Sequence, residues 1–362
     1  MAGVSGSRFL RDPKFYLGLS VSAVFLFLAF FTVEYDPAFA VKAKIDFGRM
    51  WHSITHANAL FVALVMAQVL FMLFVRGHRW SLFLKPIKRV SWVLLGWSTC
   101  IGFAVNNLLP ARLGEVARTI SASRKTGIGF GAVFGTVVVE RIYDTLSILV
   151  LFVLSLYVWE FSGPMQKLTA AVYEQFGLSI SQRGIAVNLT VLVLAVLFAI
   201  VMLKWQTDRA LKADEFFLRL LPGRWRVRIL DGLRNFIGGL TQTKNPLEVA
   251  WIVFISAMLW IISAFSVWLG LLACGIDAGA TDTIFVLMGM VIAVSIPASP
   301  GYVGPYHFLA ATAAVIAMDI DWNQDMGAAI VIHLANYLPQ TISGLYALAK
   351  EGLSFKEIEK IE

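Results

Sequence analysis

Long apolar runs separated by short polar segments dominate the pattern of hydrophobic and polar positions along the chain. Several runs approach or exceed the ~20 residues that a helix needs to cross the hydrocarbon core of a bilayer. The runs show no alternation of period two, so they favour helices over the strands of a closed barrel. We predict membrane elements at residues 15–33, 57–75, 90–109, 128–159, 184–203, 248–274, 283–318 and 326–349.

The composition supports a membrane protein. Of the 362 residues, 58% are hydrophobic and only 15% are charged, and the mean hydropathy is +0.75. Soluble domains are less apolar and carry more charge. Cys100 and Cys274 lie in or beside apolar runs, which indicates small packing residues and not a disulfide framework. The predicted fold class is an all-α polytopic membrane protein with a single integral membrane domain, residues 1–362.

The distribution of Lys and Arg predicts the orientation in the membrane. Segments 76–89 and 204–248 are both basic, which places them, and both termini, in the cytoplasm. Residues 111–126 carry four more cations and also look cytoplasmic, although an apolar run separates them from 76–89. A single crossing cannot leave both of its ends on one side of the membrane. We therefore predict a re-entrant hairpin at residues 90–126.

A second hairpin is predicted at residues 283–318, because both of its flanks are acidic and contain no Lys or Arg. An acidic, cation-free flank is typical of the outer side of a membrane. The acidic residues of these flanks are Asp277, Asp282, Asp319, Asp321 and Asp325.

The two predicted hairpins resemble each other. Each contains a Pro-x-x-x-Gly element, Pro110 to Gly114 in the first and Pro300 to Gly304 in the second. We therefore predict two inverted repeats, 1–160 and 184–350, whose broken helices meet near the midplane of the membrane. This arrangement is common in transporters.

Within the basic segment 204–248, apolar residues recur at spacings of three and four between Val227 and Leu240, which predicts an amphipathic helix. Its arginines would draw it to anionic headgroups on the inner leaflet. Packing against its own membrane domain is the alternative. No nucleic-acid partner is expected, because no recognised binding motif accompanies the charge.

The sequence ERIYD, residues 140–144, interrupts an otherwise apolar stretch. Charged side chains are costly inside a membrane unless they are paired. Glu140 and Asp144 share a helix face, and Arg141 can reach Asp144 at i,i+3, so we predict a net negative cluster with an internal ion pair. The excess carboxylate favours a role in a transport pathway over a purely structural ion pair.

The stretch VNNLLPARLGEVARTI, residues 105–120, places polar residues at the edge of an apolar run. Pro110 suits the first turn of a helix that Asn106 or Asn107 can cap, and the free amides of such a start favour an anion.

Two arginines of the same stretch strengthen this prediction. Arg112 and Arg118 suit bidentate contact with phosphate, and Glu115 can hold Arg118 at i,i+3. We predict a site for an anionic headgroup at the end of a broken helix. The alternative is the plain start of a cytoplasmic helix.

The sequence SIPASPGYVGPYH cannot remain one helix, because it contains Pro300, Gly301, Gly304 and two further prolines. His307, on the first turn after this break, is a candidate for titration or phosphate binding. The last crossing carries polar residues that more often join helices than bind substrate. They are His333, Asn336, Tyr337 and Gln340.

We expect neither a metal nor an organic cofactor. The chain contains no Walker loop, GxSxG or Rossmann fingerprint, so ATP-driven transport and common hydrolase chemistry lack support. His52 and His56 stand at i,i+4 but lack the intervening glutamate of a metalloprotease.

Three motifs together, NNLLPARLGEVAR, VVVERIYD and IPASPGYVGPYH, resemble the membrane region of the lysylphosphatidylglycerol synthase family, the flippase part of the multiple peptide resistance factor. The resemblance covers nearly the whole chain. It implies a fold of eight membrane elements with re-entrant segments, and lipid translocation as the activity. The lipid aminoacylation of the family belongs to a separate soluble domain, which we do not expect in a chain of this length.

Residue by residue, the resemblance points to one set of positions in the three motifs. The set is Asn107, Pro110, Arg112, Gly114, Glu115, Arg118, Glu140, Arg141, Asp144, Pro297, Pro300, Gly301 and Gly304. His307 departs from the family, since many relatives have glutamate there. Substrate identity and ion coupling therefore do not transfer with the resemblance.

These predictions combine into a lipid flippase or transporter, and not an enzyme, in a bacterial cytoplasmic membrane. Its expected partner is an anionic phospholipid, a polyprenyl-phosphate-linked lipid or a hopanoid-type lipid, and a homo-oligomer is compatible with the sequence. Arg112 and Arg118 would hold the headgroup while residues 140–144 act as gate or coupling cluster. The alternatives are a glycosyl- or acyl-transferase that uses ERIYD as acid/base, and a non-catalytic scaffold for an enzyme of a lipid pathway.

Overall fold

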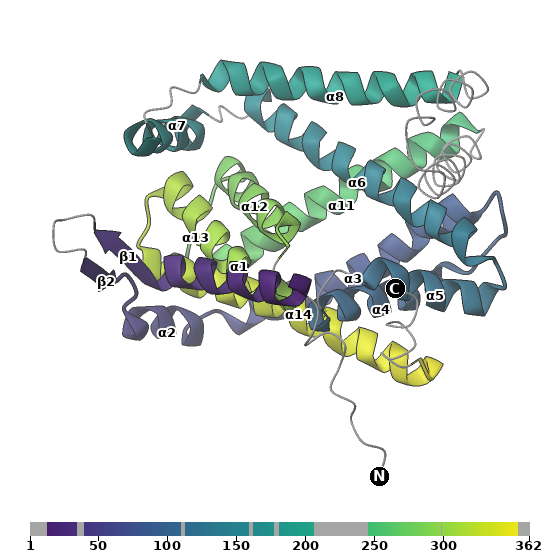
Figure 1. Ribbon diagram of the computed structural model, residues 1–362, viewed down its shortest axis with the longest axis horizontal. Coiled ribbons are helices and arrows are strands. Elements are labelled where there is room, and N and C mark those ends of the chain that lie inside the picture. Colours follow the sequence, from purple (N-terminus) through teal and green to yellow (C-terminus); the bar gives the residue numbers. More distant parts are fainter. Residues whose placement is uncertain are drawn as a thin grey trace, which may run out of the picture.

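Helices carry almost all of the described structure (Figure 1). The computed structural model describes residues 13–34, 40–109, 113–158, 162–176, 181–205, 245–297 and 299–353. The first helices are α1 (Pro13–Phe30), α2 (Phe47–Thr55), α3 (Ala59–Leu84), α4 (Trp92–Leu108), α5 (Gly114–Thr126), α6 (Phe130–Val158), α7 (Ser162–Phe176) and α8 (Gln182–Trp205). The later ones are α11 (Pro246–Ala273), α12 (Ala280–Ser295), the 3-10 turn η4 (Pro300–Tyr302), α13 (Pro305–Met318) and α14 (Trp322–Glu351).

A short antiparallel sheet is the one departure from helices in the described ranges, and it is too small to change the predicted all-α class. Strands β1 (Phe31–Glu34) and β2 (Ala40–Ala43) pair with Phe31 opposite Ala43. The sequence Phe-Thr-Val has high strand propensity, which explains why α1 ends at Phe30, before the predicted limit of 33.

Helices occupy all eight predicted membrane elements, with two further differences. The element 57–75 continues as α3 to Leu84, so much of the predicted basic loop 76–89 is helical. The element 283–318 is two helices, α12 and α13, separated by η4. By length and composition, α3 and α11 are each able to cross a membrane, and α1 and α12 are shorter apolar helices. The segment predicted as an amphipathic helix, from Val227 to Leu240, lies outside the described residues, as does the whole range 206–244.

Helix α14 joins the two ends of the molecule (Figure 1). Near its start it packs against α2 and α13, and further along it packs against α3 and α4. Helix α4 lies between α3 and α14 and approaches both closely. A Cβ on Gly344 of α14 would lie 2.9 Å from the carbonyl carbon of Cys100 in α4. Glycine at this contact therefore sets the distance between the two backbones.

Two pairs of helices form compact hairpins, α4 with α5 and α12 with α13. In each hairpin a glycine faces a carbonyl oxygen of the partner helix. A Cβ on Gly102 would lie 2.9 Å from the oxygen of Gly114, and a Cβ on Gly289 would lie 2.8 Å from that of Leu309. The two segments predicted as hairpins thus pack in a similar way. Their direction relative to a membrane, and the inverted repeat, stay predictions.

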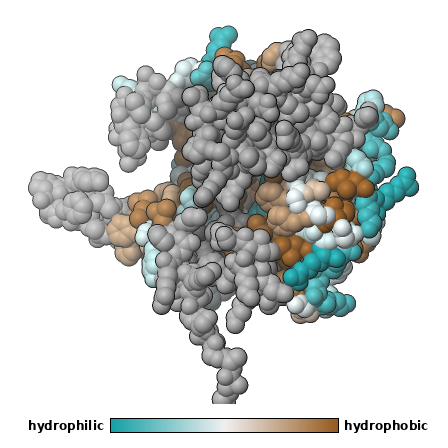
Figure 2. All heavy atoms as spheres, turned by 45° about the vertical axis from the view of Figure 1, so that its right-hand side comes forward, coloured by the Kyte–Doolittle hydropathy of each residue, from teal (hydrophilic) through white to brown (hydrophobic). Residues whose placement is uncertain are grey.

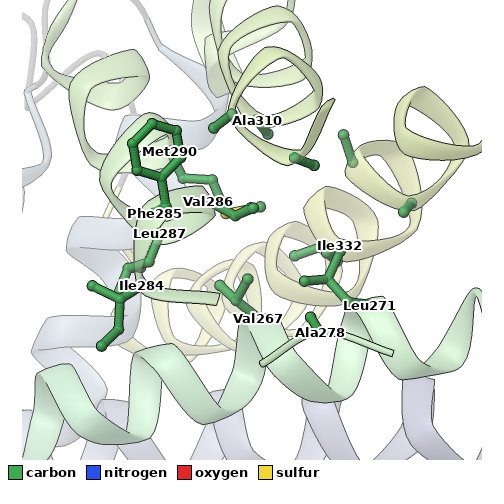
Figure 3. Packing of buried hydrophobic residues seen from close by; sticks show 14 of the residues in the cluster. Val267, Leu271, Ala278, Ile284, Phe285, Val286, Leu287, Met290, Ala310 and Ile332 are labelled. Carbon is green, nitrogen blue, oxygen red and sulfur yellow. The ribbon is translucent and has the colours of Figure 1, made fainter. Parts of the chain in front are cut away.

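The largest apolar cluster fills the space between α11, α12, α13 and α14 (Figure 3). Apolar side chains also cover the outer faces of α3, α8 and α11, where several large residues are more than 40% exposed. Among them are Leu64, Phe71, Leu194, Phe198, Trp251 and Phe254. Figure 2 shows an apolar surface next to a hydrophilic edge on one face of the molecule. Such extended apolar surface is typical of a protein that contacts lipid.

Replacing Gly77 by alanine tests the close contact between α3 and α4. The new Cβ would lie 2.6 Å from the Cα of Gly96, and backbone atoms cannot move aside as a side chain can. We expect the variant to lose about 1–3 kcal/mol of stability, measured as a lower unfolding temperature of the purified protein in detergent.

Gly131→Ala is the matched control. Gly131 lies on an exposed turn of α6, and a Cβ added there would meet no other atom within 4 Å. This variant should unfold at the wild-type temperature or slightly above it. Equal unfolding temperatures for Gly77→Ala and wild type would contradict the close contact.

Candidate functional site

A cavity of about 650 Å³ lies among α3, α4, α5, α6, α11, α12 and α14. One wall is charged and polar. Its side chains come from α3 to α6, among them Arg76, Asn106, Asn107, Glu115, Arg118, Arg141 and Asp144. The other wall is apolar and comes mainly from α11 and α12, with Val267, Leu287, Met290, Val291 and Val294. The cavity is therefore amphipathic.

Glu140 is the centre of an ion cluster beside the cavity, although it does not line the cavity itself. Its side chain is fully buried, and its carboxylate accepts hydrogen bonds from three arginines on three helices. Arg79 Nη2 of α3 donates at 3.1 Å, Arg118 Nη1 of α5 at 3.2 Å, and Arg141 Nη2 of α6 at 2.9 Å. Hydrogen bonds between charged groups are stronger than those between neutral groups, so Glu140 holds α3, α5 and α6 in contact.

Asp144, one turn further along α6, is the second carboxylate of the cluster. It accepts from Arg79 Nη1 at 2.6 Å and forms ion pairs with Arg76 at 3.4 Å and with Arg141 at 3.1 Å. The predicted i,i+3 pair of Arg141 and Asp144 is confirmed. Arg79 also donates to Ser256 Oγ of α11 at 2.9 Å, which links a fourth helix to the cluster.

The prediction of a net negative cluster is wrong. Four guanidinium groups meet two carboxylates, so the formal charge is 4 − 2 = +2. The charge pattern places Arg76 and Arg79 in a cytoplasmic loop, whereas α3 carries both into the interior, with Arg79 fully buried. A signal for this is in the sequence. Apolar residues continue past the two arginines to Leu84, and the arginines stand at i,i+3 on one helix face.

Arg118 has hydrogen-bonding capacity that the protein does not use. The side chain lines the cavity, is only 4% exposed and lies over the Trp80 ring, 4.9 Å from its centroid. Its Nη2 is buried and has no hydrogen-bond partner among the described residues. A buried donor without an acceptor costs free energy, and an anion in the cavity would remove that cost.

Only part of the predicted helix start is described. The described part of α5 begins at Gly114, and Pro110 and Arg112 lie outside the described residues, so the start at Pro110 and the role of Arg112 stay predictions. Asn106, one of the two residues predicted as a cap, lies in the last turn of α4. Its side chain caps the start of α5 across the hairpin. Its Oδ1 accepts from Gly114 N at 2.7 Å.

Two more residues of this stretch have partners that the sequence did not predict. Asn107 Nδ2 donates to Thr341 Oγ1 of α14 at 3.0 Å, so it joins α4 to α14. Glu115 accepts from Asn106 Nδ2 at 3.5 Å, while the carboxylate that pairs with Arg118 is Glu140. Both Asn107 and Glu115 still line the cavity.

The second break lies beside the cavity and depends on left-handed backbone. Gly301 and Gly304 have φ of +70° and +101°, which favours glycine at both positions. Tyr302, between them, also has a positive φ and lines the cavity. A Cβ on Gly301 would lie 3.5 Å from the oxygen of Asn107, so the break touches the end of α4. Pro300 and Gly304 do not line the cavity.

His307 forms a hydrogen bond with a second histidine, His333, and reaches the cavity only through it. Its Nδ1 accepts from Gly304 N at 3.4 Å, and its Nε2 lies 3.0 Å from His333 Nδ1. The first bond leaves the proton on Nε2, so we assign His307 as the donor to His333. His333 stacks on Tyr306 and lines the cavity, whereas His307 does not. The candidate for phosphate contact is therefore His333 and not His307.

Helix α14 contributes more to the cavity than the sequence indicates. Its polar residues are predicted to join helices, yet all four line the cavity: His333, Asn336, Tyr337 and Gln340. Within the described ranges, no group of three or more His, Cys, Asp or Glu side chains is arranged to hold a metal.

Comparison with protein families identifies one match. The model of the lysylphosphatidylglycerol synthase TM region matches residues 15–344, which is most of the chain. No curated protein and no solved structure gives a significant match.

Replacing Glu140 by glutamine should destabilise the protein by about 3–5 kcal/mol, because the buried Arg79 and Arg118 and the partly exposed Arg141 lose the charge that they share. Thermal unfolding in detergent measures the loss. Glu248→Gln is the control, since Glu248 forms a partly exposed pair with Lys85 and its loss should cost at most about 1 kcal/mol. If the two variants unfold alike, Glu140 does not hold the cluster together.

Proposed function

Since the chain belongs to the family of the lysylphosphatidylglycerol synthase TM region, a membrane family of lipid metabolism or transport, we propose that it is a flippase. In this proposal it moves an anionic lipid, or a lipid-linked anionic headgroup, across the membrane through the amphipathic cavity. The candidates are an anionic phospholipid, a polyprenyl-phosphate-linked lipid and a hopanoid-type lipid that carries an anionic group.

The observation that carries the proposal is the unused donor of Arg118. A buried guanidinium with a free Nη2, in a cluster of formal charge +2, faces a cavity of about 650 Å³. Guanidinium groups match phosphate in geometry and charge. Because Arg118 is buried, the attraction between its guanidinium and an anion is stronger than it would be at an exposed surface.

The apolar wall distinguishes a lipid from a small soluble anion. Leu287, Met290, Val291 and Val294 of α12 line the same cavity as the arginines. A lipid presents both a charged headgroup and an apolar tail, so it satisfies both walls at once. A small soluble anion would leave the apolar wall in contact with water.

The transport path rests on the two hairpins. In this proposal α4–α5 enters the membrane from the cytoplasm, α12–α13 enters from outside, and the two are inverted repeats whose breaks meet at the cavity. The contact of Gly301 with Asn107 supports such a meeting of the two breaks. Both termini, and the basic segment 204–248, are then on the cytoplasmic side of a bacterial inner membrane.

The ion cluster serves as the gate in this proposal. Arg79, Arg118 and Arg141 hold α3, α5 and α6 to one carboxylate. A headgroup that binds Arg118 Nη2 shares the guanidinium with Glu140, which Nη1 contacts, and so weakens the attraction between Arg118 and Glu140. Binding would therefore loosen α5 from α6, which is a direct way for cargo to change the conformation of the first hairpin.

The enzyme alternative has less support. A general acid/base must reach its substrate, whereas Glu140 does not line the cavity and is held as a carboxylate by three arginines. Asp144 lines the cavity, but three arginines hold it as well. No observation favours the scaffold alternative.

The proposal predicts loss of lipid movement when Arg118 is replaced by glutamine. Proteoliposomes containing fluorescent phosphatidylglycerol, or a fluorescent polyprenyl phosphate, measure headgroup translocation. Loss of a charge-assisted bond to the cargo should slow transport about tenfold or more. Arg118→Lys retains the charge but not the fork geometry, and we expect an intermediate rate.

Arg49→Gln is the matched control, because Arg49 is an exposed arginine outside the cavity. Its transport rate should equal that of the wild type. Unchanged transport in folded Arg118→Gln would refute the assignment of the headgroup site. Absence of movement by folded wild-type protein with either lipid, together with turnover of a lipid-linked donor, would favour the transferase.

A further inference from the structure

Asp325, on the first turn of α14, is a buried carboxylate without a partner. Its side chain is 1% exposed. Both carboxylate oxygens are shielded, and neither has a hydrogen-bond partner among the described residues. Its backbone N–H donates to Asp321 O at 3.1 Å, as in an ordinary first helical turn. The arginine cluster, in contrast, satisfies both of its carboxylates.

The face of α14 that continues from Asp325 is apolar. Residues three, four and seven positions further along lie on the same side of an α-helix. Here they are Ala328, Ala329 and Ile332, all buried in the largest apolar cluster. Figure 3 shows Ile332 pointing toward Leu271 of α11 in this cluster. Asp325 therefore lies where the apolar cluster reaches the start of α14.

Titratable groups surround this end of α14, but none is bonded to Asp325 in the described structure. They are Lys44 after β2, Asp46, Arg49, His52 and His56 on or beside α2, Cys274, Asp277 and Asp282 between α11 and α12, Asp319 after α13, and Asp321 on α14 itself. The two cations have other contacts. Lys44 Nζ lies 3.0 Å from the centroid of the Trp322 ring, and Arg49 pairs with Asp46.

The neighbouring carboxylate, Asp321, provides Asp325 with neither a hydrogen bond nor an opposite charge. Asp321 accepts from the backbone and side-chain nitrogens of Asn323 at 3.2 and 3.3 Å, as the cap of α14. Two carboxylates one turn apart repel each other when both are charged. Burial and this repulsion act in the same direction, and both favour a neutral Asp325.

We propose that Asp325 is a proton-binding site. The carboxylate takes a proton from water to become a neutral carboxylic acid, and releases it again as the pH rises. In the neutral form the first turn of α14 can remain packed in the apolar cluster. In the ionised form an unpaired charge must be hydrated, which displaces this turn outward.

Helix α14 connects this site to the cavity. Asn336 lies eleven residues beyond Asp325, about three turns along the same side of the helix, and His333 is one turn nearer. Both line the cavity. Movement of the first turn of α14 would therefore reach the cavity through one continuous helix. This second step rests on the proposed function, and it couples lipid movement to the proton concentration.

Infrared spectroscopy of the folded protein in lipid tests the proton site without any transport. A protonated carboxyl in an apolar environment gives a C=O band distinct from that of a carboxylate. We expect this band in the wild type at neutral pH, its loss at higher pH, and its absence from Asp325→Asn. Asp321→Asn is the matched control and should retain the band.

Two results would overturn the proton site. One is a wild-type spectrum in which Asp325→Asn removes no protonated carboxyl. The other is a band that changes when sodium replaces potassium at constant pH, which would make Asp325 a ligand of a metal cation. Asp325→Leu guards against a folding artefact, because an apolar side chain suits the surroundings and should retain the unfolding temperature of the wild type.

Transport in proteoliposomes tests the coupling separately. If one proton is coupled to movement, the wild-type rate should change by up to about tenfold per pH unit near the titration of Asp325, and Asp325→Asn should give a flat profile. A wild-type pH profile in Asp325→Asn would overturn the coupling while leaving the proton site intact. If the wild type moves no lipid, the proposed function fails, and the infrared result still decides whether Asp325 binds a proton.

Discussion

The carboxylate of Glu140 is the interaction on which the rest of the site depends. It gathers three arginines at one point, the buried Arg79 and Arg118 and the partly exposed Arg141, and so brings α3, α5 and α6 together. The desolvation of these charges is offset only when the whole network forms. The three helices therefore have one favourable arrangement around the cavity, and the excess positive charge of the cluster is fixed beside it.

This constraint explains how the cavity is divided. The arginines hold the polar wall in the first part of the chain, whereas the apolar wall belongs to α11 and α12 of the second part. Helix α14 completes the cavity with His333 and its polar neighbours and packs against both groups of helices. Glycines such as Gly77 and Gly344 permit this arrangement, because they let α3, α4 and α14 approach closely enough to enclose a small volume.

The sequence is sufficient for features that depend on local pattern. Apolar runs predict the helices, and the motifs around Arg118 and Glu140 predict residues that share one network in the structure. It is insufficient where tertiary contacts decide. The charge of the segment after residue 75 is that of a loop, and although its continuing apolar residues indicate a helix, the partners that bury Arg79 are known only from the packing of α3 against α6. His307 likewise depends on a partner 26 residues away, which no local spacing indicates.

The charge of the cluster also determines which step of transport is difficult. An anion beside a formal charge of +2 in a largely apolar cavity is held strongly, so release requires more change than binding. Arg118 is the member of the cluster on the hairpin α4–α5, and its Nη2 is a buried donor without a partner among the described residues. Withdrawal of this hairpin would remove one positive charge from the cavity while Glu140 keeps Arg79 and Arg141. The network can therefore lose its contact with the cargo without leaving a buried carboxylate unpaired.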